Sequence, residues 1–171
     1  RYENRKNNEK LFFMGITMQN HGGYTETYDN FPENYYKVGR SYTDANQYLS
    51  LVHESDEAVK NLISYFSKVD DPVEIIFFGD HQPSLNSNFY PILNGKGLTG
   101  LTEDELEKLY TVPFFIWTNY DTPEETVDIT SLDYLSTMAL ERAGIELPAY
   151  NKFLADMQEL SLIHISEPTR P

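Results

Sequence analysis

The chain has 171 residues, of which 40% are hydrophobic, so it can bury a core of one folded domain and is not a disordered segment. Thirteen Lys and Arg residues against 27 Asp and Glu residues give a net charge of −14. So acidic a chain argues against nucleic acid as a partner, because it repels phosphate backbones. The chain has no cysteine, which excludes a disulfide scaffold and a thiolate zinc site.

The first half of the chain predicts a strand, a loop and a helix. Leu11–Met18 is a nearly continuous apolar run, as in a strand buried on both faces, and it ends in a polar cluster at residues 19–24. Residues 25–43 are rich in Tyr, Asn, Asp and Pro and predict an ordered surface loop. The tyrosines here either form an aromatic wall for a sugar or glycerol headgroup or pack the loop onto the domain; they are Tyr24, Tyr28, Tyr35, Tyr36 and Tyr42. Apolar residues at helical spacing predict a helix from about Asp44 to Ser67.

The second half predicts two more strands and two helices. A strand at Val73–Phe78 is followed by a loop at 82–101, and a capping box at Thr102–Glu105 begins a short helix. A third apolar strand covers Val112–Trp117, and an amphipathic helix runs from near Ser131 to a glycine stop at 143–144. This alternation predicts an α/β domain with a mainly parallel sheet flanked by helices, with ligands at the carboxyl ends of the strands.

The sharpest chemical motif is Gly79-Asp80-His81-Gln82, directly after the second predicted strand. Carboxylate oxygen and imidazole nitrogen are ligands that zinc and manganese sites share, and the preceding glycine allows close approach to an ion or phosphate. The alternative is a loop in which Asp80 caps a turn and His81 is merely exposed.

A second polar motif, Asn20-His21-Gly22-Gly23, follows the first predicted strand. His21 could bind a phosphoryl oxygen or act as a general acid. The alternative is that its side chain only stabilises a glycine turn.

Three segments in order resemble the lipoteichoic acid synthase-like and sulfatase-like phosphoglycerol transferases of the alkaline phosphatase superfamily. They are residues 16–21 with their "NH" turn, residues 75–83 with a "GDH" metal-binding segment, and the strand at residues 112–121. Residues 147–154 are similar to the closing segment of that family. The resemblance covers residues 11–160 and implies the C-terminal part of an alkaline-phosphatase-like α/β domain, incomplete in this chain.

The resemblance also implies a chemistry. Asp80 and His81 would be metal ligands, with Mn²⁺ as the ion, and His21 would contact a phosphoglycerol headgroup. A threonine nucleophile, expected upstream and so not among these residues, would transfer glycerol phosphate from a phosphatidylglycerol-type lipid to a polymer acceptor. The parent enzyme would face the outside of a bacterial cell membrane, attached through an N-terminal region that precedes this chain.

Two other functions remain open. A sulfatase or phosphoethanolamine transferase would keep the same fold, and a non-catalytic cell-surface binding domain would hold no metal at Asp80 and His81. The domain is expected to cover residues 1–160. Ser161–Pro171 fits neither a helix nor a strand of this domain and resembles a non-native read-through tail, so it is left out of the functional assignment.

Overall fold

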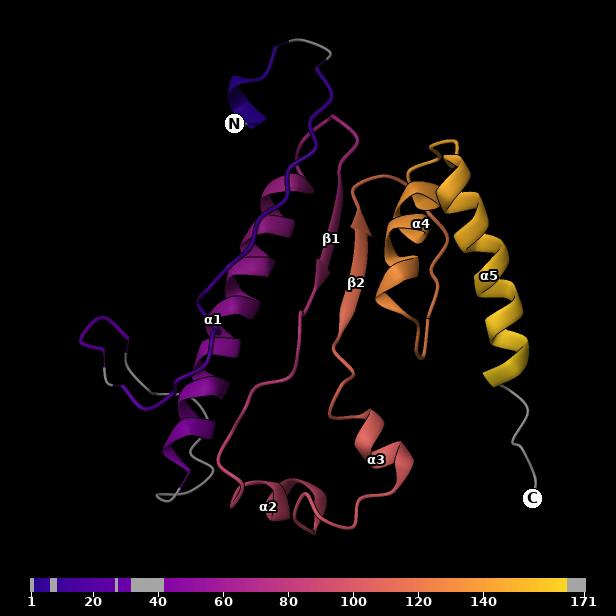
Figure 1. Cartoon of the computed structure of the whole chain (residues 1–171). Helices are drawn as coiled ribbons and strands as arrows, with labels where there is room; N and C mark the ends of the chain where they lie inside the picture. Colours follow the sequence, from indigo (N-terminus) through magenta and orange to yellow (C-terminus); the bar gives the residue numbers. More distant parts are fainter. Residues whose placement is uncertain (1, 7–8, 27, 32–41, 166–171) are drawn as a thin grey trace. The chain divides into compact units, whose positions relative to one another are not determined.

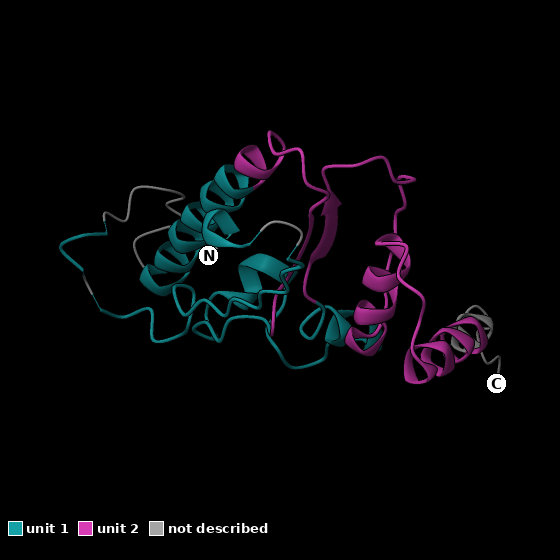
Figure 2. Ribbon diagram, turned by 90° about the horizontal axis from the view of Figure 1, so that it is seen from above, with its two compact units in different colours: residues 1–62, 81–111 teal, residues 63–80, 112–171 magenta. Residues whose placement is uncertain are grey.

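The computed structural model of the protein describes residues 2–6, 9–26, 28–31 and 42–165, with the side chains described as far as residue 160. The chain forms two compact units, which Figure 2 colours separately. Unit 1 comprises residues 1–62 and 81–111, and unit 2 comprises residues 63–80 and 112–171. Each unit is described on its own below.

Unit 1 is built on the long helix α1, Thr43–Phe66, whose last turn belongs to unit 2 (Figure 1). This helix confirms the one predicted from about Asp44 to Ser67. Its fully buried positions, however, are the small or polar residues Ala45, Gln47 and Ser50. Tyr24 and Phe89 are also buried in unit 1, and their rings meet Tyr48 and Tyr42 edge to face, so the core of unit 1 lies along the first turns of α1.

Three short helices complete unit 1: η1 at Tyr2–Asn4, α2 at Tyr90–Asn94 and α3 at Glu103–Glu107. Helix α2 falls in the predicted loop and was not expected. It has a proline in its first turn, where no backbone N–H is needed, and ends at Gly95 with a φ of 73°. Helix α3 confirms the predicted capping box, because Thr102 accepts from the Glu105 N–H and Glu105 accepts from the Thr102 N–H.

Unit 2 contains the two strands β1, Glu74–Phe78, and β2, Phe114–Thr118. They confirm the second and third predicted strands. They pair antiparallel with Ile76 opposite Ile116, so the described strands do not form the parallel pairing that was expected. Phe77 and Phe115 lie opposite each other and stack with ring centroids 5.4 Å apart.

Helices α4, Leu132–Arg142, and α5, Ala149–Ile165, pack together in unit 2 (Figure 1). Helix α4 confirms the predicted amphipathic helix: Ser131 caps it, and Gly144 follows it with a φ of 65°. The buried side chains at this helix pair are apolar, apart from Thr137 and Asn151, which bond to each other at 3.0 Å. The apolar members are Leu135, Ala139 and Leu154.

Two further expectations are wrong. Residues 11–18 form no strand, and their large apolar side chains are 47% to 88% exposed, because no described segment pairs with this backbone or covers it. The predicted tail was expected to be neither helix nor strand, yet α5 continues through residues 161–165. The rest of that tail, 166–171, lies outside the described residues.

Candidate functional site

His21 lies in a tight turn that α1 holds in place. Its N–H donates to the Met18 carbonyl oxygen at 3.1 Å, which closes the turn. Ser55 of α1 donates to Asn20 Oδ1 at 3.1 Å, and the Tyr24 hydroxyl donates to the Asn20 carbonyl oxygen at 2.7 Å. The His21 side chain itself is exposed, so a fixed backbone presents an accessible imidazole.

Tyr24 anchors the other end of this turn. Its ring is 6% exposed and meets Tyr48 of α1 edge to face, with centroids 5.4 Å apart. Burial raises the pKa of Tyr48, so this phenol stays neutral at physiological pH. Tyr24 is therefore a structural tyrosine, which settles the choice left open for this residue of the loop. Tyr35 and Tyr36 lie outside the described residues.

A concavity of about 390 Å³ lies within unit 1 and includes His21. The turn contributes one side of it, and α1 contributes Gln47, Leu51 and Glu54. Those three residues are spaced four and three apart, so they share one face of the helix. Tyr28 and Phe31 add aromatic surface from the loop.

Gln47 is the unusual member of this concavity. It is 2% exposed, and its Nε2 donates to the Glu26 carbonyl oxygen at 2.9 Å. Its Oε1 is buried and accepts no hydrogen bond. An unmade bond at a buried amide oxygen costs about 1–3 kcal/mol.

The predicted metal ligands, Asp80 and His81, directly follow the end of β1. Both side chains are exposed, and the boundary between the two units falls between them. His81 Nδ1 lies 2.9 Å from the Gln82 carbonyl oxygen. That contact orients the ring, as outer partners of metal-bound histidines do.

Packing against a neighbouring segment explains why residue 79 is a glycine, which the sequence did not reveal. Its N–H donates to the Pro113 carbonyl oxygen at 3.2 Å, which extends the ladder beyond β1. A Cβ at this position would lie 3.1 Å from the Cβ of Val112. Within unit 2, the close approach of the neighbouring chain therefore favours glycine at this position, whereas the sequence suggested approach to an ion or phosphate.

The chemistry of Asp80 and His81 fits a divalent cation, since one offers carboxylate oxygen and the other imidazole nitrogen. Two side chains are too few to hold such an ion. Among the described residues, no group of three or more His, Asp or Glu side chains is arranged to bind a metal.

An α/β domain with a carboxylate and an imidazole at the end of a strand has the features of a metal-assisted hydrolase or transferase. Comparison with protein families identifies it: the Sulfatase family model matches residues 1–145, and the chain belongs to that family. The family places it in the alkaline phosphatase superfamily, with its α/β fold. Members of this superfamily typically depend on divalent metals.

Two relatives are known from Rhizobium meliloti (strain 1021). A protein named "Putative cyclic beta-1,2-glucan modification protein" is 28% identical over 159 residues, which cover 88% of this chain and 25% of the relative. "Capsular polysaccharide biosynthesis protein RkpI" is 35% identical over 79 residues, which cover 46% of this chain and 13% of the relative. The chain thus spans about a quarter or less of these relatives. No solved structure matches it significantly.

The structure brings His21 into the concavity with residues that sequence reasoning did not select. The missed residues are Gln47 and Glu54, which were assigned only to a helix. Their spacing with Leu51 was the available signal. The other signal was Gln47 itself, a polar residue on the buried face of the first turns of α1.

Proposed function

We propose that the protein containing this chain transfers glycerol phosphate from a phosphatidylglycerol-type lipid to a cell-envelope glycan. The observation that carries this proposal is the family match over residues 1–145 together with similarity to a glucan modification protein over 88% of the chain. The reaction would take place on the outer face of a bacterial cell membrane. No described helix is both long enough and apolar enough to cross a membrane.

In this proposal, Asp80 and His81 contribute to holding a divalent cation, with Mn²⁺ as the expected ion. When bound, such an ion supplies charge neutralisation at the phosphoryl oxygens and lowers the pKa of an attacking hydroxyl. His21 contacts the phosphoglycerol group from its exposed position in the turn. The nucleophile, expected to be a threonine, is supplied from outside these 171 residues.

Sulfate ester hydrolysis is the second candidate, and the family to which the chain belongs favours it directly. Sulfate and phosphate esters have similar tetrahedral geometry, so both suit a metal-assisted displacement. A phosphoethanolamine transferase of the same fold would differ in the headgroup. Similarity to proteins named for glucan modification and polysaccharide biosynthesis favours a transferase that decorates a glycan.

The decisive experiment measures headgroup release from phosphatidylglycerol by the full-length protein with Mn²⁺, with an aryl sulfate as the alternative substrate. Asp80→Ala should lower lipid turnover by about a hundredfold or more, since it removes a metal ligand. Asp56→Ala is the matched control, because Asp56 is an exposed carboxylate on α1. Turnover of the sulfate alone would assign the protein to the sulfate esters, and unchanged lipid turnover in Asp80→Ala would refute the metal role.

A further inference from the structure

The concavity of unit 1 has a chemical character that the proposed function does not explain. Its described lining includes one carboxylate, Glu54, and no Lys or Arg. A site for a phosphate group needs cations or several converging N–H donors, and a carboxylate beside it is unfavourable. This concavity therefore suits a neutral ligand better than an anionic one.

Its polar atoms suit a ligand rich in hydroxyl groups. Glu54 of α1 lines the concavity and offers exposed carboxylate acceptors. Hydroxyl groups donate to such oxygens. The carboxylate is exposed, so it can meet a ligand without first losing a buried partner.

The aromatic side chains supply the apolar part of the same recognition. Tyr28 lines the concavity and is 55% exposed, so its ring is accessible, whereas the ring of Tyr24 is buried and forms part of the wall. The C–H faces of a pyranose ring pack on such an accessible aromatic ring, while its hydroxyl groups bond to acceptors around the edge. The volume of about 390 Å³ accommodates one or two sugar rings.

We infer that this concavity is a binding subsite for a neutral saccharide, formed by Tyr28 as the stacking residue and by Glu54 as the hydroxyl acceptor. This inference rests on the proposed function, for which it identifies the acceptor-binding surface. His21 lines the same concavity. In this proposal, His21 therefore lies between the saccharide acceptor and the phosphoglycerol headgroup that His21 contacts. Glycerol shares the hydroxyl chemistry but lacks a ring face, so the two ligands are distinguishable.

The test is direct binding of a glucose disaccharide to the whole 171-residue chain, measured by saturation-transfer NMR without metal or lipid. Tyr28→Ala should weaken binding about tenfold, and Tyr28→Phe should retain it, because the ring and not the hydroxyl packs on the sugar. Tyr110→Ala is the matched control, since Tyr110 is 83% exposed and does not line the concavity. Circular dichroism confirms that each variant is folded.

Glycerol and glycerol phosphate are tested beside the disaccharide. Binding of the disaccharide that is lost in Tyr28→Ala and kept in Tyr110→Ala supports the inference. Preference for glycerol phosphate, no saccharide binding by the folded chain, or equal loss in both alanine variants overturns it. This experiment measures binding and no turnover, so absence of saccharide binding would not refute the transferase proposal. Equally, absence of lipid turnover in the full-length protein would not change how the binding result is interpreted.

Discussion

Asn119 is the residue that joins the chain entering β1 to the chain leaving β2. Its Nδ2 donates to the carbonyl oxygens of Phe66, Val69 and Asp71 at 2.8–3.1 Å. Its Oδ1 accepts from the Val73 N–H at 2.7 Å, and its own N–H donates to the Val73 carbonyl oxygen. One amide side chain thus bonds to three carbonyl oxygens between Phe66 and Asp71, in addition to the turn bond that the Val69 N–H donates to the Phe66 carbonyl oxygen.

We expect Asn119→Ala to lower the free energy of unfolding by roughly 2 kcal/mol, because several backbone groups lose their partner and only some regain water. Asn119→Asp should cost at least as much, since a carboxylate cannot donate to the three carbonyl oxygens. Urea denaturation measures both. Asn61→Ala is the control, because Asn61 is exposed on α1, and a loss in Asn119→Ala no larger than in this control would contradict the prediction.

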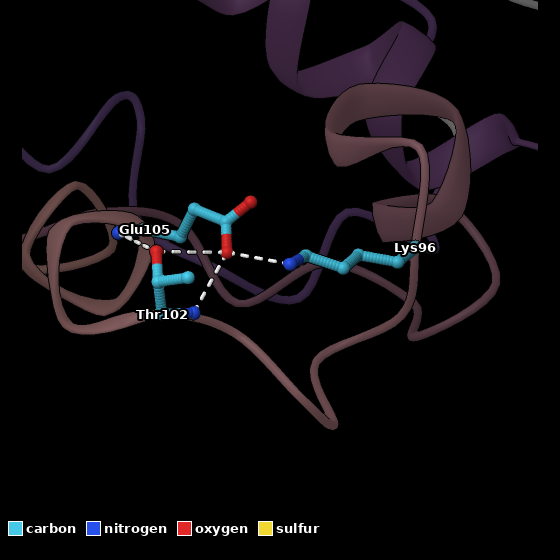
Figure 3. Close-up of polar contacts among 3 residues, drawn as sticks. All are labelled: Lys96, Thr102 and Glu105. Atoms are coloured by element: carbon cyan, nitrogen blue, oxygen red, sulfur yellow. Dashed lines mark hydrogen bonds and ion pairs between the residues drawn. The ribbon is translucent and has the colours of Figure 1, made fainter.

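At the scale of single elements, helix α3 is stabilised by a small charged cluster. Lys96 Nζ lies 2.7 Å from Glu105 Oε2, which also accepts from the Thr102 N–H at 2.7 Å and from the Thr102 hydroxyl at 3.0 Å (Figure 3). The hydrogen bond from Lys96, followed by that from the Thr102 backbone, lowers the pKa of Glu105 to about 2. The ion pair and the capping box therefore act on the same carboxylate oxygen.

This cluster predicts acid sensitivity of α3. The folded pKa of Glu105 is below its ordinary value of 4.5, so its contribution is fully present above pH 4.5 and is lost as the pH falls towards 2. In Lys96→Met, an NMR titration of the Glu105 carboxylate should show the pKa moving up towards 4.5. Lys108→Met, which removes a cation next to the same helix, should leave it nearly unchanged. Equal shifts in both variants would show that the positive charge around the helix, and not the contact between Lys96 and Glu105, lowers the pKa of Glu105.

The elements also show how far the sequence could predict this fold and its site. Helices α1 and α4, strands β1 and β2 and the α3 cap were predictable, because periodicity and capping residues are local signals. The apolar run at Leu11–Met18 was misassigned as a strand because a strand is defined by its partner, and no local pattern shows whether a partner is present. That Asp80 and His81 directly follow a strand was predictable, whereas their role as metal ligands stays a prediction. The burial of Gln47 could only be suspected from the spacing along the helix, since it depends on the segment packed against α1.

At the scale of the whole molecule, the segment at residues 11–18 carries several large apolar side chains that are exposed. Phe12 is 88% exposed and Ile16 is 78% exposed. The others, between 47% and 68% exposed, are Leu11, Phe13, Met14 and Met18. Several exposed apolar side chains on one short segment favour association, whereas isolated ones do not.

We expect this chain to self-associate in a concentration-dependent manner despite its net charge of −14, because side chains on one short segment can meet while the acidic groups stay apart. The double change Phe12→Ser and Ile16→Ser should shift sedimentation equilibrium towards the monomer. The matched control is Leu132→Ser with Tyr150→Ser, two residues that are 60% and 67% exposed on α4 and α5. If both double variants shift the equilibrium equally, association depends on total exposed apolar area, and the segment has no special part in it.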